Sequence, residues 1–298
     1  MQLICGGEAE VTPHLIRGLA SEDKVRQLAP GADLARALRG VSVVHHVGGP
    51  ELDPDSGRPR AVPGTGLRSL VEAMLQSRVR RLVYLSSACV YGALVPHGPG
   101  ARLDELTEPQ PRHPLERAYW AEERWLKAQR ELQVVILRGA QPAAAGDRLL
   151  AELKARLKLG GLRLPSGGRA PRTFIAASDL GRALGAAARR GQPGSVLLAG
   201  GFVASWREMA QALDPKARIG SVPYELAHLA AGLGLGRQGR GWWRQEALDH
   251  LARPQVLDDA RSRRDLVWSP LVTSLAECSD ELSLTGSKTR PVRSPRGR

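Results

Sequence analysis

Two glycine pairs and one serine pair each follow a short apolar run, and they are the residues of this chain best placed for chemistry. They are Gly6 and Gly7 after QLIC, Gly48 and Gly49 after VSVVHHV, and Ser86 and Ser87 after RLVYL. A glycine lets a ligand approach the backbone closely because it has no Cβ. A serine hydroxyl donates and accepts hydrogen bonds. Each pair marks the end of an expected strand, and the plain interpretation of these positions is that they are loop residues.

The histidines and cysteines do not predict a metal site. His45 and His46 are adjacent, so on a strand they point to opposite faces and cannot ligate one ion. The three cysteines lie far apart, with no CxxC or Cys/His pairing: Cys5, Cys89 and Cys278. This spacing favours a reducing compartment over a disulfide framework or a zinc site. Cys89 is expected to be a small buried residue.

Short apolar runs alternate with helical periodicity through the first two thirds of the chain. Strands are expected at residues 2–5, 41–47, 81–85 and 133–137, with helices at 14–20, 66–76 and 118–129. Strands separated by helices of this length indicate a parallel sheet covered on both faces. Beyond about residue 140 the chain is richer in loops, with helices expected at 148–159 and 178–190.

The formal charge of +13 is unevenly distributed. Five positive charges lie among Pro, Ser and Gly in the last 11 residues: Lys288, Arg290, Arg293, Arg296 and Arg298. We expect residues 286–298 to form a basic disordered tail. Elsewhere arginines are mixed with acids, and no nucleic-acid recognition motif is present. The charge therefore favours a solvated surface plus tail, with nucleic acid an unlikely partner and weak polyanion binding as the alternative.

No basic leader precedes a long apolar run in MQLICGG, and the apolar stretch at 226–235 is broken by His228 and by glycines. It is shorter than the roughly 20 residues that span a bilayer. We expect a cytoplasmic protein with no membrane partner.

Several blocks, in order, resemble the extended short-chain dehydrogenases/reductases, the NAD-dependent epimerases/dehydratases and 3β-hydroxysteroid dehydrogenases. They are residues 64–65 (GT), 70–73 (LVEA), 79–92 (VRRLVYLSSACVYG), 134–138 (VVILR), 146–149 (GDRL), 173–180 (TFIAASDL) and 257–270 (LDDARSRRDLVWSP). The resemblance implies a Rossmann-like doubly wound parallel sheet with a smaller C-terminal substrate region. It assigns residues 1–140 to a nucleotide-binding region and residues 141–285 to a substrate-binding region interleaved with it.

The resemblance implies catalytic roles for Ser87 and Tyr119. In that family the Tyr hydroxyl passes a proton to or from the substrate while a hydride moves to or from the nicotinamide. A Lys four residues after the Tyr contacts the ribose and lowers the Tyr pKa from its free value of about 10. Here that position is Glu123, and a carboxylate there would raise the pKa of Tyr119. Arg124 or Lys127 could substitute only with a shifted geometry, and a packing role for Tyr119 is the alternative.

The resemblance also implies NAD or NADP, with Gly6, Gly7, Val47, Gly48 and Ser86 as its binding residues. The family opens with TGGxGFIG, and this chain has CGGEAEVT. Two motif glycines have thus become Ala9 and Thr12, and Glu8 and Glu10 bring negative charge toward a pyrophosphate.

The adenosine end is also altered. If residues 25–28 form the second strand, its end lacks the acid that normally holds the ribose. Asp33 is expected to cap a helix at 34–38 instead. The span from Gly7 to the run at 41–47 is shorter than in the family by roughly a strand. Cofactor binding is therefore expected to be weak or absent.

Three functions stay open on the sequence. One is an NAD(P)-dependent oxidoreductase or epimerase/dehydratase with impaired or lost catalysis, acting on an unknown small hydroxylated substrate. The other is a non-catalytic pseudoenzyme that serves as a scaffold, ligand-binding or regulatory subunit. A polyanion-binding role for the tail is a third. The family resemblance also implies a possible homodimer, and Trp242 and Trp243 are a further candidate surface or packing pair.

Overall fold

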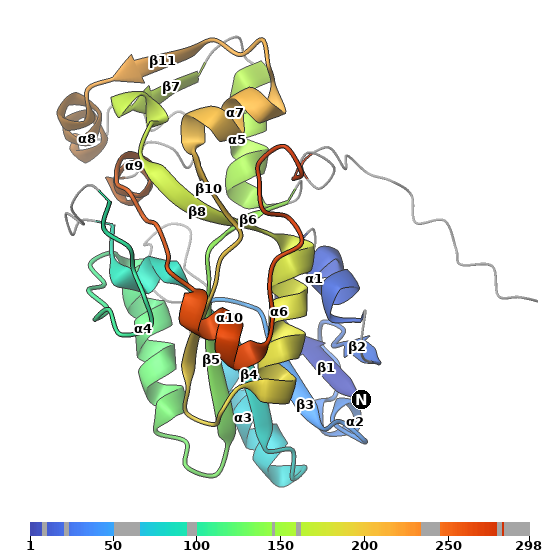
Figure 1. The fold of residues 1–298 in the computed structure, drawn as a ribbon. Helices are drawn as coiled ribbons and strands as arrows, with labels where there is room; N and C mark the ends of the chain where they lie inside the picture. The colour runs from blue at the N-terminus through green and yellow to red at the C-terminus, as the bar shows by residue number, and fades with distance from the viewer. Residues whose placement is uncertain are drawn as a thin grey trace, which may run out of the picture.

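The computed structural model describes residues 1–7, 11–20, 24–50, 66–93, 100–144, 147–158, 162–233, 245–278 and 282. Its larger part is built on a six-stranded sheet in the order β2-β1-β3-β4-β5-β9 (Figure 1). These strands are β1 (Gln2–Cys5), β2 (Val25–Gln27), β3 (Val43–His46), β4 (Arg81–Ser87), β5 (Gln133–Gly139) and β9 (Val196–Ala199). Every neighbouring pair is parallel, which confirms the predicted parallel α/β sheet.

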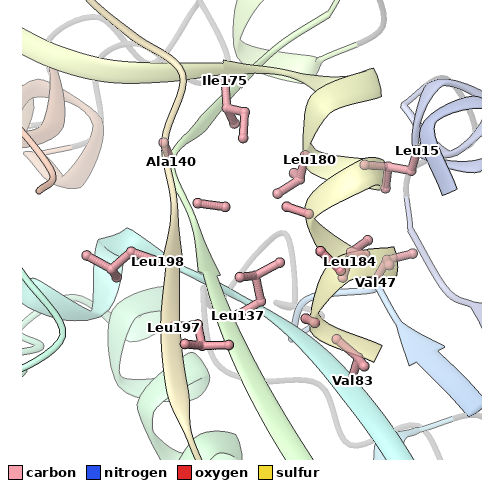
Figure 2. Packing of buried hydrophobic residues seen from close by; sticks show 14 of the residues in the cluster. Leu15, Val47, Val83, Leu137, Ala140, Ile175, Leu180, Leu184, Leu197 and Leu198 are labelled. Atoms are coloured by element: carbon pink, nitrogen blue, oxygen red, sulfur yellow. The ribbon is translucent and has the colours of Figure 1, made fainter. Parts of the chain in front are cut away.

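Helices cover both faces of this sheet. One face carries α1 (Thr12–Leu19) and α6 (Ala177–Arg190); the other carries α2 (Leu34–Ala37), α3 (Leu67–Gln76) and α4 (Pro114–Lys127). Residues of β4 alternate between the two cores: Val83 joins the α1/α6 cluster, whereas Leu82 and Tyr84 join the opposite one. Figure 2 shows Leu180 of α6 on the side of Leu137 of β5. The sheet is therefore doubly wound, as the resemblance implied.

The sheet is short on one side of β1. A dinucleotide-binding sheet usually has two further strands beyond its first strand, whereas here, among the described residues, only β2 lies there. β2 confirms the second strand expected at 25–28, and the Asp33 side chain accepts hydrogen bonds from Ala35 N and Arg36 N at the start of α2, as predicted. The structure thus agrees with the shortened span between Gly7 and β3.

A smaller region packs at the carboxyl end of the sheet strands. It contains a three-stranded sheet in the order β10-β8-β6 and a parallel pair β11-β7. Its strands are β6 (Gln141–Ala143), β7 (Leu162–Pro165), β8 (Pro171–Ala176), β10 (Phe202–Ser205) and β11 (Ile219–Val222). Its helices are α5 (Arg148–Lys158), α7 (Trp206–Leu213), α8 (Tyr224–Gly232) and α9 (Gln245–Ala252).

Sequence patterns predicted α5 and α6 but none of the strands after residue 140, because each is short and lacks a long apolar run. Both α6 and β9 return to the main sheet, although they lie beyond that residue. A further helix, α10 (Ala260–Leu266), packs against α6 and β9. The division at residue 140 stays a prediction.

Two glycines allow α1 and α6 to pack with their backbones in contact. A Cβ built on Gly18 would lie 2.8 Å from the carbonyl carbon of Ser178, and one on Gly181 would lie 2.9 Å from that of Leu15. Real Cβ atoms do not approach backbone atoms so closely. Both neighbours are backbone, so neither can rotate away, and any side chain at these positions must push the helices apart.

Gly18→Ala should therefore lower the free energy of unfolding by about 1–3 kcal/mol, the usual range for overpacking a tight contact. The matched control is Gly220→Ala on β11, where a Cβ would lie an ordinary 3.4 Å from Cγ of Arg163. The control should change stability by no more than about 0.5 kcal/mol, as surface substitutions do. Equal urea midpoints for the two variants would contradict the close packing of α1 on α6.

Candidate functional site

The predicted site residues lie at the carboxyl edge of the sheet, where β1, β3 and β4 end. In open parallel sheets, ligands bind outside these ends, at the point where the strand order reverses. β1 has β2 on one side and β3 on the other, so its end marks such a point. Gly6 and Gly7 follow it with φ of +76° and +93°, backbone angles that favour glycine. Val47 and Gly48 follow β3, and the Val47 N–H donates to Cys5 O at 2.9 Å.

Atoms of the protein itself fill the space beside these glycines. A Cβ on Gly6 would lie 2.7 Å from the backbone nitrogen of Gly48, so the two loops touch. A Cβ on Gly7 would overlap the hydroxyl of Thr12, the buried residue that replaces a motif glycine. The structure thus brings Gly6, Gly7, Val47 and Gly48 together. Other atoms of the chain lie where side chains at positions 6 and 7 would lie.

Tyr119 reaches the same edge from α4. Its hydroxyl lies against Gly49, where a Cβ would be 2.6 Å from the phenol Cζ. The half-buried ring packs against both cores of the sheet. Ser87, at the end of β4, accepts a hydrogen bond from Cys89 N at 3.2 Å and so begins the short 3₁₀ helix η1 (Ala88–Tyr91). The two predicted catalytic residues therefore lie on adjoining elements, and Ser87 has a structural role.

Glu123, one turn after Tyr119, points into the protein and binds Arg138 through two hydrogen bonds. Arg138 Nε donates to Oε1 at 3.0 Å and Nη2 donates to Oε2 at 2.7 Å. The side chains are 0% and 2% exposed, respectively. Ser86 donates to Glu123 Oε1 at 2.6 Å, so this predicted cofactor residue is also drawn into the pair. The position that holds a cation in the resembled family therefore holds half of a buried ion pair.

Arg138 is held on its other side by aromatic residues. Its Nη1 donates to the hydroxyl of Tyr91 at 3.1 Å, and its guanidinium lies 4.9 Å from the Tyr91 ring centroid and 5.7 Å from that of Trp120. Burial lowers the pKa of Arg138, but its hydrogen bonds and charge attraction with Glu123 outweigh burial and raise it overall. The guanidinium thus stays charged and compensates Glu123. The repulsion that a lone carboxylate would exert on Tyr119 is offset.

The two other cations considered for the Lys role lie outside this pair. Arg124 is exposed, one position round the helix from Glu123. The Lys127 ammonium lies 5.8 Å from the Trp120 centroid, and partial burial lowers the pKa of Lys127, with the Glu123 charge opposing that effect.

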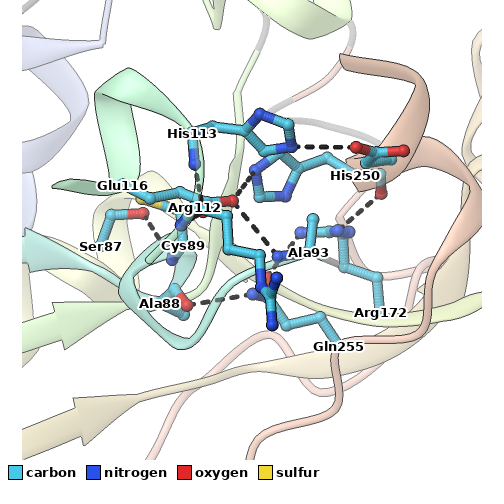
Figure 3. Close-up of polar contacts among 11 residues, drawn as sticks. Ser87, Ala88, Cys89, Ala93, Arg112, His113, Glu116, Arg172, His250 and Gln255 are labelled. Atoms are coloured by element: carbon cyan, nitrogen blue, oxygen red, sulfur yellow. Dashed lines mark hydrogen bonds and ion pairs between the residues drawn. The ribbon is translucent and has the colours of Figure 1, made fainter. Parts of the chain in front are cut away.

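A second buried carboxylate orders the start of α4. Glu116 accepts hydrogen bonds from Arg112 N at 2.7 Å, His113 N at 3.0 Å and Ala93 N at 3.2 Å, and its Oε1 lies 3.0 Å from His250 Nε2 (Figure 3). Burial raises the pKa of Glu116, but the hydrogen bonds from His250 and from the backbone outweigh it and lower the pKa. This network fixes the helix that carries Tyr119.

The same network reaches the smaller region. Asp249 of α9 lies 2.9 Å from His113 Nε2 and accepts from the Tyr224 hydroxyl. Arg172 donates to Gln255 Oε1 at 2.6 Å, and Gln255 in turn donates to the carbonyl of Ala88 at 3.0 Å (Figure 3). Residues of β8, α9 and the loop after it are thereby joined to η1.

Sequence reasoning missed Arg138, Glu116 and the histidines of this network. One signal was available for the first: Arg138 closes the apolar run VVIL, where a buried charge needs a partner. For the histidines no signal existed, because their partners lie more than 100 residues away along the chain.

No metal centre emerges in the described ranges, since no group of three or more His, Cys, Asp or Glu side chains is placed to hold an ion. His45 Nε2 lies 2.6 Å from Gln2 Oε1, whereas His46 stacks on Tyr84 with ring centroids 5.8 Å apart. The two rings thus face opposite ways, as predicted. Cys89 is only partly buried, which corrects the expectation of a buried residue, and desolvation raises the pKa of its thiol to about 12. Glu8, Ala9, Glu10, Trp242, Trp243 and the tail lie outside the described residues.

Comparison with known proteins identifies the relatives of this chain. The profile of the NAD dependent epimerase/dehydratase family matches residues 31–200, more than half of the sequence. The chain belongs to this family. No curated protein matches it significantly in sequence.

Solved structures of family type share its fold. A UDP-glucose 4-epimerase from Thermotoga maritima with UDP-glucose has a TM-score of 0.69 at 17% identity, covering 95% of this chain and 97% of the other. A dTDP-glucose 4,6-dehydratase from Streptomyces venezuelae with NAD has a TM-score of 0.68 at 17% identity, covering 95% of each. RMD from Pseudomonas aeruginosa with NADPH has a TM-score of 0.68 at 19% identity, covering 94% and 96%. At these identities the likeness concerns the fold.

The described residues fit only one end of a nicotinamide dinucleotide. Near Gly6 and Gly7, α1 begins without a side-chain cap and without an acid in its first turn, so its N-terminus suits a phosphate. At the other end, Tyr119 lies on Gly49, and position 123 offers a carboxylate bound to Arg138 in place of a cation.

Proposed function

We propose that this member of the epimerase/dehydratase family has lost hydride-transfer catalysis and acts as a ligand-binding or regulatory pseudoenzyme. The observation that carries the proposal is the buried Glu123–Arg138 pair at the family's Lys position. A Tyr acts as an acid or base near neutral pH only when a nearby cation lowers its pKa. Glu123 supplies no such cation, and Arg138 is committed to Glu123 and Tyr91.

NAD or NADP is the ligand class that the fold favours. Two of the solved relatives hold NAD and NADPH. In this chain Gly6 and Gly7 have positive φ, and α1 has no acid in its first turn. Loss of two motif glycines argues for weak binding, because Thr12 fills space beside Gly7. When bound, such a cofactor would supply hydride chemistry; this chain's described residues would contribute only phosphate contacts.

Residual NAD(P)-dependent oxidoreductase activity is the second candidate. It is favoured by the retention of Ser87 and Tyr119 on adjoining elements. It is also favoured by Lys127, a cation close enough to Glu123 for the Glu123 charge to raise the Lys127 pKa. This candidate requires micromolar cofactor affinity and a substrate proton passed by Tyr119.

A binding titration and a turnover assay separate the two. Under the proposal, NADH fluorescence shows a dissociation constant in the millimolar range or no binding. Chromatography of nucleotide sugars incubated with the protein and NAD then shows no epimerised or dehydrated product, and absorbance at 340 nm shows no net oxidation or reduction of the nicotinamide. Tyr119→Phe then changes nothing. Micromolar binding together with turnover that Tyr119→Phe lowers by about 10²–10⁴-fold, the usual contribution of a general acid, would reverse the assignment.

A restoration variant tests the reason for the loss. Glu123→Lys combined with Arg138→Met returns a cation to the family position without leaving two buried cations together. We expect no activity from it, because two motif glycines are still replaced, by Ala9 and Thr12, and the Thr12 hydroxyl lies beside Gly7. Turnover in this variant would locate the whole defect at position 123.

The compartment is proposed from the cysteines. All three are free thiols, two of them buried, which suits the reducing cytoplasm. Within the described ranges no helix has the length and apolar character to cross a membrane. A homodimer and a small-molecule substrate stay proposals that follow from the family.

A further inference from the structure

Figure 1 shows α10 beside α6, on the α1/α6 face of the sheet. A groove lined by arginines lies between these two helices. Its volume is about 610 Å³. Five of the residues lining it are arginines, contributed by both helices: Arg182, Arg189, Arg190, Arg263 and Arg264. No carboxylate lines this groove within the described chain.

The groove lies at the opposite edge of the sheet from the candidate site. Arg81, the first residue of β4, donates hydrogen bonds to the carbonyls of Ala187 and Ala188 at 3.0 and 3.3 Å. The end of α6, which carries Arg189 and Arg190, is therefore at the amino ends of the strands. Tyr119 and the glycine turns lie at the carboxyl ends.

Two of the arginines are fixed in position by partners at the groove's margin. Arg182 Nη1 donates to Asp179 Oδ1 at 2.8 Å and to the carbonyl of Ser269 at 3.1 Å. Arg263 donates through Nε to Asp259 Oδ1 at 2.8 Å and through Nη2 to the carbonyl of Gly200 at 3.2 Å. Each guanidinium has five N–H donors, so donors remain for a ligand. Their orientation is set before a ligand arrives, which lowers the entropy cost of binding.

Charge compensation within the groove is incomplete. Asp179 balances the charge of Arg182, and Asp259 balances that of Arg263. Asp265 of α10 does not compensate the groove, because it pairs at 3.6 Å with Arg261, which does not line it. Within the described chain, this leaves an excess of positive charge on Arg190 and Arg264, one on each wall of the groove. Like charges held this close repel one another, and an anion with several charges would relieve the repulsion.

We propose that this groove binds a small ligand with two or three linked phosphates. Arginine binds phosphate oxygens through two parallel hydrogen bonds, which suits a groove with guanidinium groups on both walls. The volume lies in the range of about 300–1,000 Å³ typical of small-molecule sites. A continuous nucleic-acid backbone would need a basic track extending beyond these two helices.

Trp268 gives the site a local reporter. Its ring lines the groove and is 7% exposed, and its indole N–H has no hydrogen-bond acceptor within the described chain. Binding in the groove should therefore change tryptophan emission, and Trp268→Phe should remove that change while leaving the affinity within about threefold.

The test is a calorimetric titration of the full chain with inorganic tripolyphosphate at low salt. We expect binding that Arg190→Gln with Arg264→Gln weakens by tenfold or more, since each lost charge-assisted hydrogen bond costs about 1.5–3 kcal/mol, roughly tenfold or more. The matched control, Arg130→Gln with Arg169→Gln, removes two exposed arginines elsewhere and should leave affinity within about twofold. Saturating NADH should not compete.

Three results would overturn the proposal. One is no heat of binding with tripolyphosphate at millimolar concentration. Another is equal weakening in the control pair, which would show general charge attraction. The third is binding of a single-stranded oligonucleotide, dependent on Arg190 and Arg264, that is much tighter than binding of tripolyphosphate. Because the groove and the cofactor edge are separate, a failure here leaves the proposed loss of catalysis untouched.

Discussion

Glu123→Ala should lower the free energy of unfolding by about 3–5 kcal/mol, the usual cost of breaking a buried ion pair from one side. The substitution leaves the Arg138 guanidinium, 2% exposed, without its counter-charge. Arg138 would keep only the Tyr91 hydroxyl and the two aromatic rings, and Ser86 would lose its acceptor. Urea unfolding followed by circular dichroism measures the loss.

Two controls separate the buried charge from simple truncation. Glu131→Ala removes one end of an exposed pair with Arg80 at 3.3 Å and should cost no more than about 1 kcal/mol, because surface pairs contribute little. Glu123→Leu combined with Arg138→Met removes both buried charges and should recover most of the stability lost by the single variant. A double variant less stable than Glu123→Ala would show that packing, and not the unpaired charge, sets the cost.

The elements that carry this pair were predictable, but the pair itself was not. Helical spacing predicted the helix of Tyr119 and Glu123, and the run VVILR predicted the strand of Arg138. Neither pattern shows that Glu123 turns inward to Arg138, because the direction of a side chain depends on what packs beside it. The sequence therefore pointed to an isolated, unfavourable carboxylate where the structure has a compensated one.

In the candidate site, too, the positions of the residues were predictable but their side-chain contacts were not. The family resemblance assigned Gly6, Gly7, Val47, Gly48 and Ser87 to one site, and the structure places them at one edge because parallel strands end there. Their roles stay predictions. The contacts that close this edge, such as Thr12 beside Gly7, depend on distances that spacing does not contain. In the smaller region, β7 and β11 have four residues each, too few for a periodic signal to form.

Acid should destabilise the fold because His45 is buried in its neutral form. The loss of stability should begin near pH 6.5, above the pH at which carboxylates become protonated. His45 is 0% exposed, and burial, aided by the positive charges of Arg189 and Arg81, lowers its pKa to about 3. In the unfolded chain the pKa is about 6.5. Below that value the unfolded state binds a proton that the folded state excludes. Stability is therefore lost as pH falls from about 6.5 toward 3, at about 1.4 kcal/mol per pH unit.

His45→Gln isolates this effect. The variant should be less stable at pH 7, because the contact with Gln2 Oε1 at 2.6 Å is altered, but its stability should fall less steeply between pH 6.5 and 5, by about 1.4 kcal/mol per unit. His113→Gln is the control of opposite sign. The hydrogen bond to Asp249, the largest effect, raises the pKa of His113, so its contribution is present below pH 6.5 and is lost as pH rises above that value. Removing His113 should thus change the slope on the alkaline side, where His45 has no effect. Parallel pH profiles for the wild-type chain and His45→Gln from pH 6.5 to 5 would show that His45 takes up its proton without unfolding.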